Sequence, residues 1–116
     1  MATGTITNLY AAQTDTCSQV AQGTIEINNV IKIGDICFIT YQLTGATIAG
    51  NAGTICRLPE GFRPKNYSVN CLGRLNYGGT TGEYNITINS EGYVRTNIGS
   101  NTVTAVYIRN LAFPLA

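Results

Sequence analysis

The sequence contains no histidine and no tryptophan, and only 11% of its 116 residues are charged. Without histidine, the chain lacks the commonest general base and the commonest metal ligand, which excludes the usual catalytic triads. Its four cysteines, Cys17, Cys37, Cys56 and Cys71, include no CxxC pair of the kind that zinc sites use, so we expect free, buried thiols. These absences predict a chain with no metal site, no cofactor and no catalytic residue.

The low charge also limits the partners. A net charge of +1 provides no field for holding phosphate backbones, so nucleic acid is not an expected partner. No apolar run approaches the roughly 18 residues of a membrane span, and the start "MATGTITNLY" lacks the basic and apolar regions of a signal peptide. We therefore expect that the chain is made in the cytoplasm and does not insert into a membrane. Such a surface stays soluble either by burial in an oligomer or through hydrated hydroxyl and amide groups.

Thr, Asn and Gly supply much of what remains, with sixteen, twelve and thirteen residues. Thr favours strands, whereas Asn and Gly favour turns with positive φ, so the composition predicts short strands joined by tight turns. No segment repeats its apolar residues with the period of 3.6 that a helix requires. The chain is therefore expected to be all-β.

Two segments predict β-hairpins. In "TIEINNVIKIGDICFITYQL" the turn falls at Gly34 and Asp35, and the doublet Asn28–Asn29 interrupts the alternation and predicts a bulge. In "EYNITINSEGYVRTNI" the turn is "NSEG". The side chains expected to face the core are Cys37, Ile39, Tyr41 and Leu43 in the first hairpin and Tyr84, Ile86 and Ile88 in the second.

The remaining segments predict further strands and loops. Residues 44–54 are small and polar and predict a loop with a short strand embedded in it, followed by a strand over 55–58. Alternation returns from Tyr67 and is broken only by Leu72, after which "YGGTTG" predicts a loop over 77–82. The last strand is expected over 102–113, where Pro114 ends its pairing.

Together with "GTITNLY" near the start, these segments give about eight strands. Eight short strands in one domain predict two packed antiparallel sheets, a jelly-roll-like β-sandwich, because an open sheet leaves one face uncovered. We expect the sandwich to form a head domain over residues 24–116. Residues 1–23 are expected to form an N-terminal strand, an arm or a linker.

Catalysis would have to depend on six carboxylates, because histidine is absent. Glycoside hydrolysis needs two carboxyl groups about 5 to 10 Å apart across a cleft. A strand length separates Glu83 from Glu91, so solvated turn charges are the simpler interpretation. The six are Asp15, Glu26, Asp35, Glu60, Glu83 and Glu91.

Two stretches carry residue types that suit saccharide binding. Such a site stacks an aromatic ring on the apolar side of a sugar and binds its hydroxyl groups with planar donors and acceptors. "RLNYGG" and "YVRTN" each combine an aromatic, a cation and an amide, although ordinary solvent-facing strand positions are the simpler explanation for any one of these residues. The candidate ligand-binding residues are Arg74, Asn76, Tyr77, Tyr93, Arg95 and Asn97.

The stretch "LPEGFRPK", residues 58–65, resembles the LP-x-G-[YF]-RP signature common in C-terminal domains of bacteriophage tail-fibre, baseplate and receptor-binding proteins. The flanking segments "GDICFITYQLTG" and "ITINSEGYV" are similar to the strand and the hairpin that surround the signature in such domains. The resemblance spans roughly residues 24–113. Within it, "LPEG" predicts a type I turn with Pro59 in the second position and Gly61 in the fourth. Phe62 is expected to be buried at the end of the core, and Arg63 and Lys65 are expected to face solvent or a neighbouring subunit.

The resemblance implies a β-sandwich head that forms a homotrimer and binds host cell-surface polysaccharide or a teichoic-type polymer. It also implies a place in the virion tail or baseplate, beside other tail proteins, after assembly in the cytoplasm of the bacterial host. Such heads commonly contact sugars through His or Trp, which this sequence lacks, so no binding residue carries over by position. Two alternatives stay open: a structural or assembly module without a sugar site, and a polysaccharide-degrading enzyme.

Overall fold

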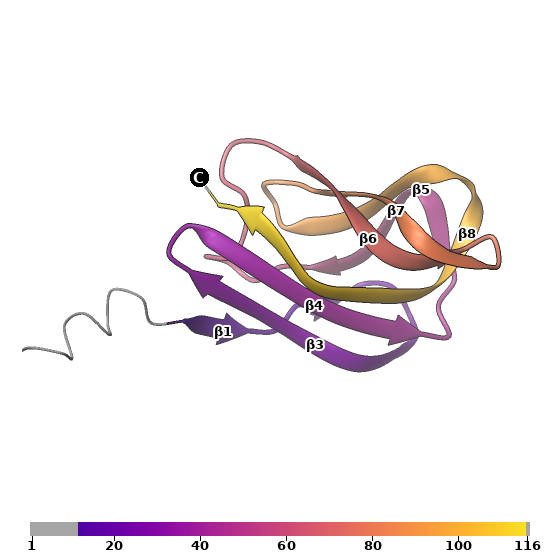
Figure 1. The fold of residues 1–116 in the computed structure, drawn as a ribbon, viewed down its shortest axis with the longest axis horizontal. Coiled ribbons are helices and arrows are strands. Elements are labelled where there is room, and N and C mark those ends of the chain that lie inside the picture. Colours follow the sequence, from indigo (N-terminus) through magenta and orange to yellow (C-terminus); the bar gives the residue numbers. More distant parts are fainter. Residues whose placement is uncertain (1–11, 116) are drawn as a thin grey trace, which may run out of the picture.

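The computed structural model describes residues 12–115, which form eight β-strands and no helix (Figure 1). No helix in this part of the chain is long and apolar enough to cross a membrane. The strands are β1 (Gln13–Asp15), β2 (Ser18–Gln19), β3 (Thr24–Ile33), β4 (Ile36–Thr44), β5 (Ile48–Arg57), β6 (Val69–Tyr77), β7 (Thr80–Ile88) and β8 (Tyr93–Pro114). The all-β prediction and the number of strands are confirmed.

All eight strands belong to one antiparallel sheet that curls upon itself. The main order is β1-β3-β4-β8-β5-β2, and the β6–β7 hairpin pairs with β8. The 22-residue β8 makes this possible, because its first part pairs with β5 and β7 and its last part pairs with β4. In Figure 1, β8 sweeps from the side of β5 and β7 to the side of β3 and β4. The predicted sandwich is thus built by one curled sheet and not by two separate sheets.

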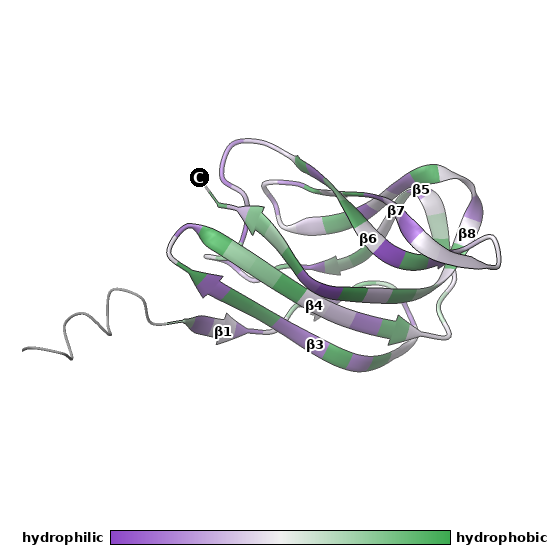
Figure 2. Cartoon of the chain, viewed as in Figure 1, coloured by the Kyte–Doolittle hydropathy of each residue, from purple (hydrophilic) through white to green (hydrophobic). Residues whose placement is uncertain are grey.

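The core lies between the two halves of this curled sheet. Apolar side chains alternate with polar ones along much of the sheet, as the alternating colours of β3 show in Figure 2. The inward faces expected for the hairpins are confirmed, since Ile39, Tyr41 and Leu43 of β4 and Ile86 and Ile88 of β7 are fully buried. One buried cluster contains side chains from both halves.

The first hairpin has its turn at Gly34 and Asp35, as the sequence predicts. The bulge predicted at Asn28–Asn29 is wrong, because the register shifts between Ile25 and Ile27. Asn28 has a different role: its amide accepts a hydrogen bond from the Cys17 N–H and donates one to the Cys17 carbonyl, each 2.8 Å long. The polar residue therefore fixes a neighbouring segment without interrupting its own strand.

The loop predicted over 44–54 is wrong, because most of it belongs to β5. This strand contains three register shifts where it pairs with β8, which conceal the alternation. At Ala52 the backbone reaches a φ of 58°, a left-handed conformation that L-residues rarely adopt. The buried Thr96 hydroxyl stabilises the irregular stretch, since it accepts a hydrogen bond from the Gly53 N–H and donates one to the Ala49 carbonyl.

Two further boundaries differ from the predictions. The loop expected over 77–82 is only a two-residue turn, with φ values of 60° and 85° at Gly78 and Gly79, and Thr80 already belongs to β7. The last strand begins at Tyr93 and not at residue 102, although its end at Pro114 agrees with the prediction. Leu72, which breaks the apolar pattern, is 55% exposed on β6.

The turn in "LPEGFRPK" is displaced by one residue from its prediction. The Phe62 N–H donates to the Pro59 carbonyl at 3.1 Å, so the turn runs over residues 59–62. Gly61 occupies its third position with a φ of 86°, which a type II turn requires and a type I turn does not. The burial predicted for Phe62 is confirmed, since only 6% of this residue is exposed.

Residues 12–23 lie against the rest of the sheet. β1 pairs with β3 and β2 pairs with β5, and between them Cys17 is buried in the core. The strand expected in "GTITNLY" lies outside the described residues. The division into an N-terminal segment over 1–23 and a head over 24–116 stays a prediction.

Candidate functional site

Tyr93 and two arginines form a compact cluster at the start of β8. Arg57 of β5 lies directly opposite Tyr93 in the strand register, and Arg95 follows two residues after Tyr93 on the same face. The guanidinium carbons of Arg57 and Arg95 lie 4.5 and 5.0 Å from the centroid of the Tyr93 ring. Both distances are typical of cation–π contacts.

Each arginine of this cluster is held by one further hydrogen bond. Arg57 Nε donates to the Glu91 carbonyl at 2.9 Å, and Arg95 Nε donates to the Thr54 hydroxyl at 3.3 Å. Both of these hydrogen bonds use the Nε atom, and neither uses the terminal guanidinium nitrogens. The arrangement thus holds two planar donor groups against an aromatic ring, which suits hydrogen bonding to hydroxyl or anionic groups.

The second predicted group occupies both faces of β6. Arg74 lies opposite Glu83 in the ladder, whereas Asn76 donates to the Thr81 hydroxyl and accepts from the Thr104 hydroxyl, at 3.1 and 3.2 Å. Tyr77 lies apart from Arg74 and Asn76, because the pairing of β6 with β8 shifts in register between Asn76 and Tyr77. Its ring packs against the core and against the Tyr84 ring, with the centroids 5.2 Å apart. Tyr77 therefore has a packing role in this structure.

Apart from Tyr77, the two predicted groups lie on the outward side of the β6–β7–β8 layer without forming one pocket. Arg74 pairs with Glu83 of β7, whereas Arg95 pairs with Thr87 of the same strand. Four residues of β7 separate these points, which corresponds to about 13 Å along the strand. Tyr93, Arg95 and Asn97 share the outward face of β8, because Val94 and Thr96 between them point into the core.

Arg74 also lines a small groove of about 140 Å³ between β6 and β8. The groove contains Glu83, Tyr107 and Arg109, and Arg109 donates a hydrogen bond to the Gln42 amide oxygen. The sequence offered no sign that Tyr107 lies near Arg74, because the two strands meet through long-range pairing.

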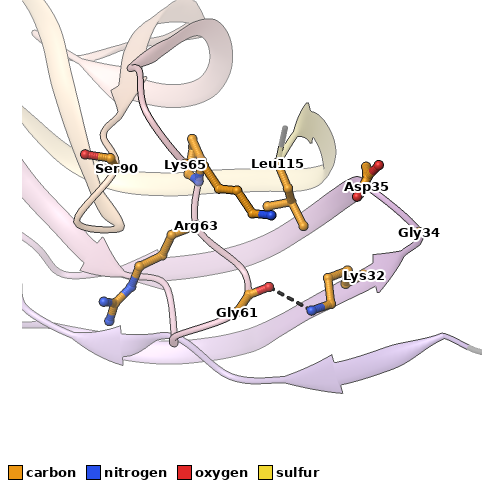
Figure 3. Close-up of a pocket in the computed structure, with 9 residues that line it drawn as sticks. Lys32, Gly34, Asp35, Gly61, Arg63, Lys65, Ser90 and Leu115 are labelled. Atoms are coloured by element: carbon orange, nitrogen blue, oxygen red, sulfur yellow. Dashed lines mark hydrogen bonds between the residues drawn. The ribbon is translucent and has the colours of Figure 1, made fainter.

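A larger cavity of about 440 Å³ lies beside the "LPEGFRPK" segment (Figure 3). Residues from the β3–β4 hairpin, the segment after β5, the β7–β8 turn and the chain end after β8 line it together. The charged and polar side chains among them are Lys32, Asp35, Arg63, Lys65 and Ser90. Sequence reasoning treated this stretch as a connector and missed the cavity, although the two cations around Pro64 were a visible signal.

The four thiols are not placed for metal binding or for nucleophilic chemistry. Burial raises the pKa of Cys37 to about 12 and that of Cys71 to about 11, and it raises the pKa of Cys56 well above the ordinary value. Residues 12–115 contain no group of three or more Cys, Asp or Glu side chains that could hold a metal ion. The thiols of Cys17, Cys37 and Cys56 are free and buried, as expected, whereas the free thiol of Cys71 is only half-buried, in contrast to the expectation.

Neither cavity contains the paired carboxylates of a glycosidase. Asp35 is the carboxylate of the larger cavity and Glu83 that of the smaller groove. Glu26 accepts hydrogen bonds from the side chains of Gln42 and Thr44. The expectation that the chain is not an enzyme stays a prediction.

Comparison with known proteins identified a structural likeness and no sequence family. No protein-family profile matches the sequence, and no curated protein matches it significantly. The structure superimposes on the crystal structure of the receptor binding protein gp15 of Listeria phage PSA with a TM-score of 0.65. The match covers 97% of this chain and 70% of that chain at 15% sequence identity. At this identity the likeness shows a shared fold.

Proposed function

We propose that the chain is the receptor-binding head of a phage tail-fibre or baseplate protein, a non-enzymatic virion component that attaches to host cell-surface saccharide. The observation that carries the proposal is the fold, which follows that of a phage receptor binding protein over 97% of the chain. The resemblance of "LPEGFRPK" to the signature of such domains supports it independently, since it depends on sequence alone. The proposed location is the virion tail, beside other tail proteins.

The Tyr93 cluster is the proposed saccharide contact. Its two guanidinium groups are fixed by the Tyr93 ring and by the Glu91 and Thr54 oxygens, so little side-chain entropy is lost when they bind hydroxyl groups. Asn97 adds an exposed amide on the same face.

Binding of the fluorescently labelled protein to a panel of bacterial strains and to their purified cell walls tests the proposal. We expect saturable binding to some strains, with competition by the soluble wall polysaccharide. Tyr93→Ala removes the aromatic ring, and Arg95→Gln removes one guanidinium group. Each substitution should weaken binding about tenfold, which corresponds to a loss of roughly 1.4 kcal/mol of binding free energy.

Tyr107→Ala is the matched control, because Tyr107 is also a partly exposed tyrosine of β8 but lies away from Tyr93. It should bind as the unaltered chain does. Equal binding by all four proteins would exclude the Tyr93 cluster as the contact. Failure to bind any strain or wall fraction would contradict the receptor-binding role.

An assembly module without a sugar site is the second candidate. The observation that favours it is an apolar patch on the outward face of the β3–β4 hairpin, where Ile33 and Ile36 are 41% and 40% exposed. Exposed apolar patches commonly mark protein contacts. A chain that oligomerises and binds other tail proteins but no cell wall would fit this candidate.

A further inference from the structure

The cavity beside "LPEGFRPK" combines two ammonium groups with hydrogen-bonding groups of other kinds. Lys32 and Lys65 line it together with Arg63, so three of the seven Lys and Arg residues of the chain lie at this cavity. Among residues 12–115, Asp35 is the only carboxylate that lines it. In a chain with so few charges, this concentration of positive side chains is unusual.

The two lysines differ in how they are held. Lys32 Nζ donates to the Gly61 carbonyl at 2.8 Å and lies 5.0 Å above the centroid of the buried Phe62 ring. Lys65 is exposed, and its ammonium group extends toward the centre of the cavity in Figure 3. Arg63 directs its guanidinium away from the lysines, because its Nε donates to the Leu58 carbonyl at 2.8 Å. One fixed and one adaptable cation therefore face the same space.

Backbone hydrogen bonds fix the walls of the cavity. The Lys65 N–H donates to the Leu115 carbonyl at 3.1 Å, and the Leu115 N–H donates to the Asp35 carbonyl at 2.8 Å. These bonds tie together three segments that are far apart in sequence. A cavity of about 440 Å³ with fixed walls lies within the size range of small-ligand sites.

We propose that this cavity binds an anionic, hydroxyl-rich unit, a polyol phosphate ester or a sugar carboxylate. Lys32 and Lys65 would hold the anionic group by charge-assisted hydrogen bonds, whereas the Asp35 carboxylate would accept hydrogen bonds from hydroxyl groups of the same unit. The Asp35 carboxylate disfavours a bare small anion but accepts hydrogen bonds from hydroxyls. This inference rests on the proposed function, since it assigns a chemical class to part of the receptor.

Two-dimensional NMR of the ¹⁵N-labelled full chain tests the inference, with glycerol 1-phosphate and glucuronate as separate anionic probes and glycerol and glucose as neutral ones. We expect saturable shifts of the Gly34, Gly61 and Lys65 amides with at least one anionic probe and none with the neutral probes. The two anionic arms distinguish a phosphate ester from a carboxylate. Shifts that scatter over all cationic surfaces, or that neutral probes reproduce, would overturn the inference.

Three variants sharpen this test. Lys65→Gln should weaken binding of the effective anionic probe about tenfold, and Lys65→Arg should retain it within about twofold, because the charge is kept. Arg109→Gln removes the same charge at an exposed residue that lines the smaller groove and not this cavity, and it should leave the affinity unchanged. Unaltered probe binding by Lys65→Gln, with its spectrum showing an intact fold, would overturn the inference.

Cell-wall binding by the same variants separates this inference from the proposed function. If Lys65→Gln loses the probe but binds walls normally, the receptor-binding role stands and the assignment of this cavity to the receptor is overturned. If the unaltered chain binds the probe at the cavity but no wall fraction, the ligand chemistry stands and the proposed function fails.

Discussion

At the scale of single residues, Tyr41 has an unusual environment. The residue is fully buried, and its hydroxyl has no hydrogen-bond partner among residues 12–115. Burial of an unpaired hydroxyl costs about 1 to 3 kcal/mol in proteins. We therefore expect Tyr41→Phe to leave the free energy of unfolding unchanged or to raise it by up to about 2 kcal/mol, as chemical denaturation would measure.

Tyr77→Phe is the matched control for this substitution. The Tyr77 hydroxyl accepts a hydrogen bond from the Asn101 N–H at 3.1 Å, so its removal should lower the free energy of unfolding by about 1 kcal/mol. A clear loss of stability in Tyr41→Phe would mean that the phenol has a partner in solution.

The buried thiols give the fold a dependence on alkaline pH. Desolvation, with a smaller contribution from Cys17, raises the pKa of Cys37 to about 12 from an ordinary value of 9.0. Between these values the unfolded chain releases the Cys37 proton and the folded chain retains it, so stability is fully present below pH 9 and falls as pH rises. Each such thiol adds a slope of about 1.4 kcal/mol per pH unit.

The slope of unfolding free energy between pH 9 and 10.5 tests this dependence. The free energy of unfolding of Cys37→Ala should fall less steeply with pH than that of the unaltered chain. This holds whatever absolute stability is lost through the space that the missing thiol leaves. Equal slopes in the two proteins would show that Cys37 does not contribute. All other side chains are the same in both proteins, so their contributions cancel from the comparison.

At the scale of elements, Asn28 of β3 holds the short strands β1 and β2 in place. Its side-chain amide makes both hydrogen bonds to the Cys17 backbone, at the point where the chain passes between the two strands. Asn28→Ala should lower the free energy of unfolding by about 1 to 3 kcal/mol, the loss of two hydrogen bonds. Hydrogen exchange at the Cys17 amide should accelerate in the same variant.

The neighbouring Asn29→Ala is the control for this prediction. Asn29 is also a half-buried amide residue of β3, but its position pairs with Thr40 of β4 and not with the N-terminal segment. It should leave exchange at Cys17 unchanged. Equal exchange rates in Asn28→Ala and the unaltered chain would contradict the holding role.

At the scale of the whole molecule, the homotrimer that the resemblance of "LPEGFRPK" implies needs a surface on which copies can meet. The outward face near the β3–β4 turn carries apolar side chains in two cross-strand rows, because the intervening Cys37 and Phe113 point into the core. We name these residues the outer apolar patch: Ile31, Ile33, Ile36, Phe38, Ala112 and Pro114. Its burial between copies would remove exposed apolar area and stabilise the assembly.

Light scattering at micromolar concentration tests the trimer. The expected mass is three times the 12.4 kDa of one chain. Ile36→Lys should yield a monomer, because a lysine in the outer apolar patch places a charge in the contact. Val20→Lys alters another exposed apolar residue and should remain trimeric. A monomeric unaltered chain would refute the trimer, and a trimeric Ile36→Lys would exclude the patch as its interface.

The sequence alone determined the all-β class, both hairpins and their inward faces. These features depend on alternation and turn chemistry, which act between residues close in the chain, as the buried Ile39 and Ile86 illustrate. The tertiary structure decided the course of β5, because register shifts against β8 conceal its alternation. It also turned Tyr77 away from Arg74 and brought Lys32, Lys65 and Leu115 around one cavity. Long-range pairing creates these arrangements, and no local pattern of residues encodes them.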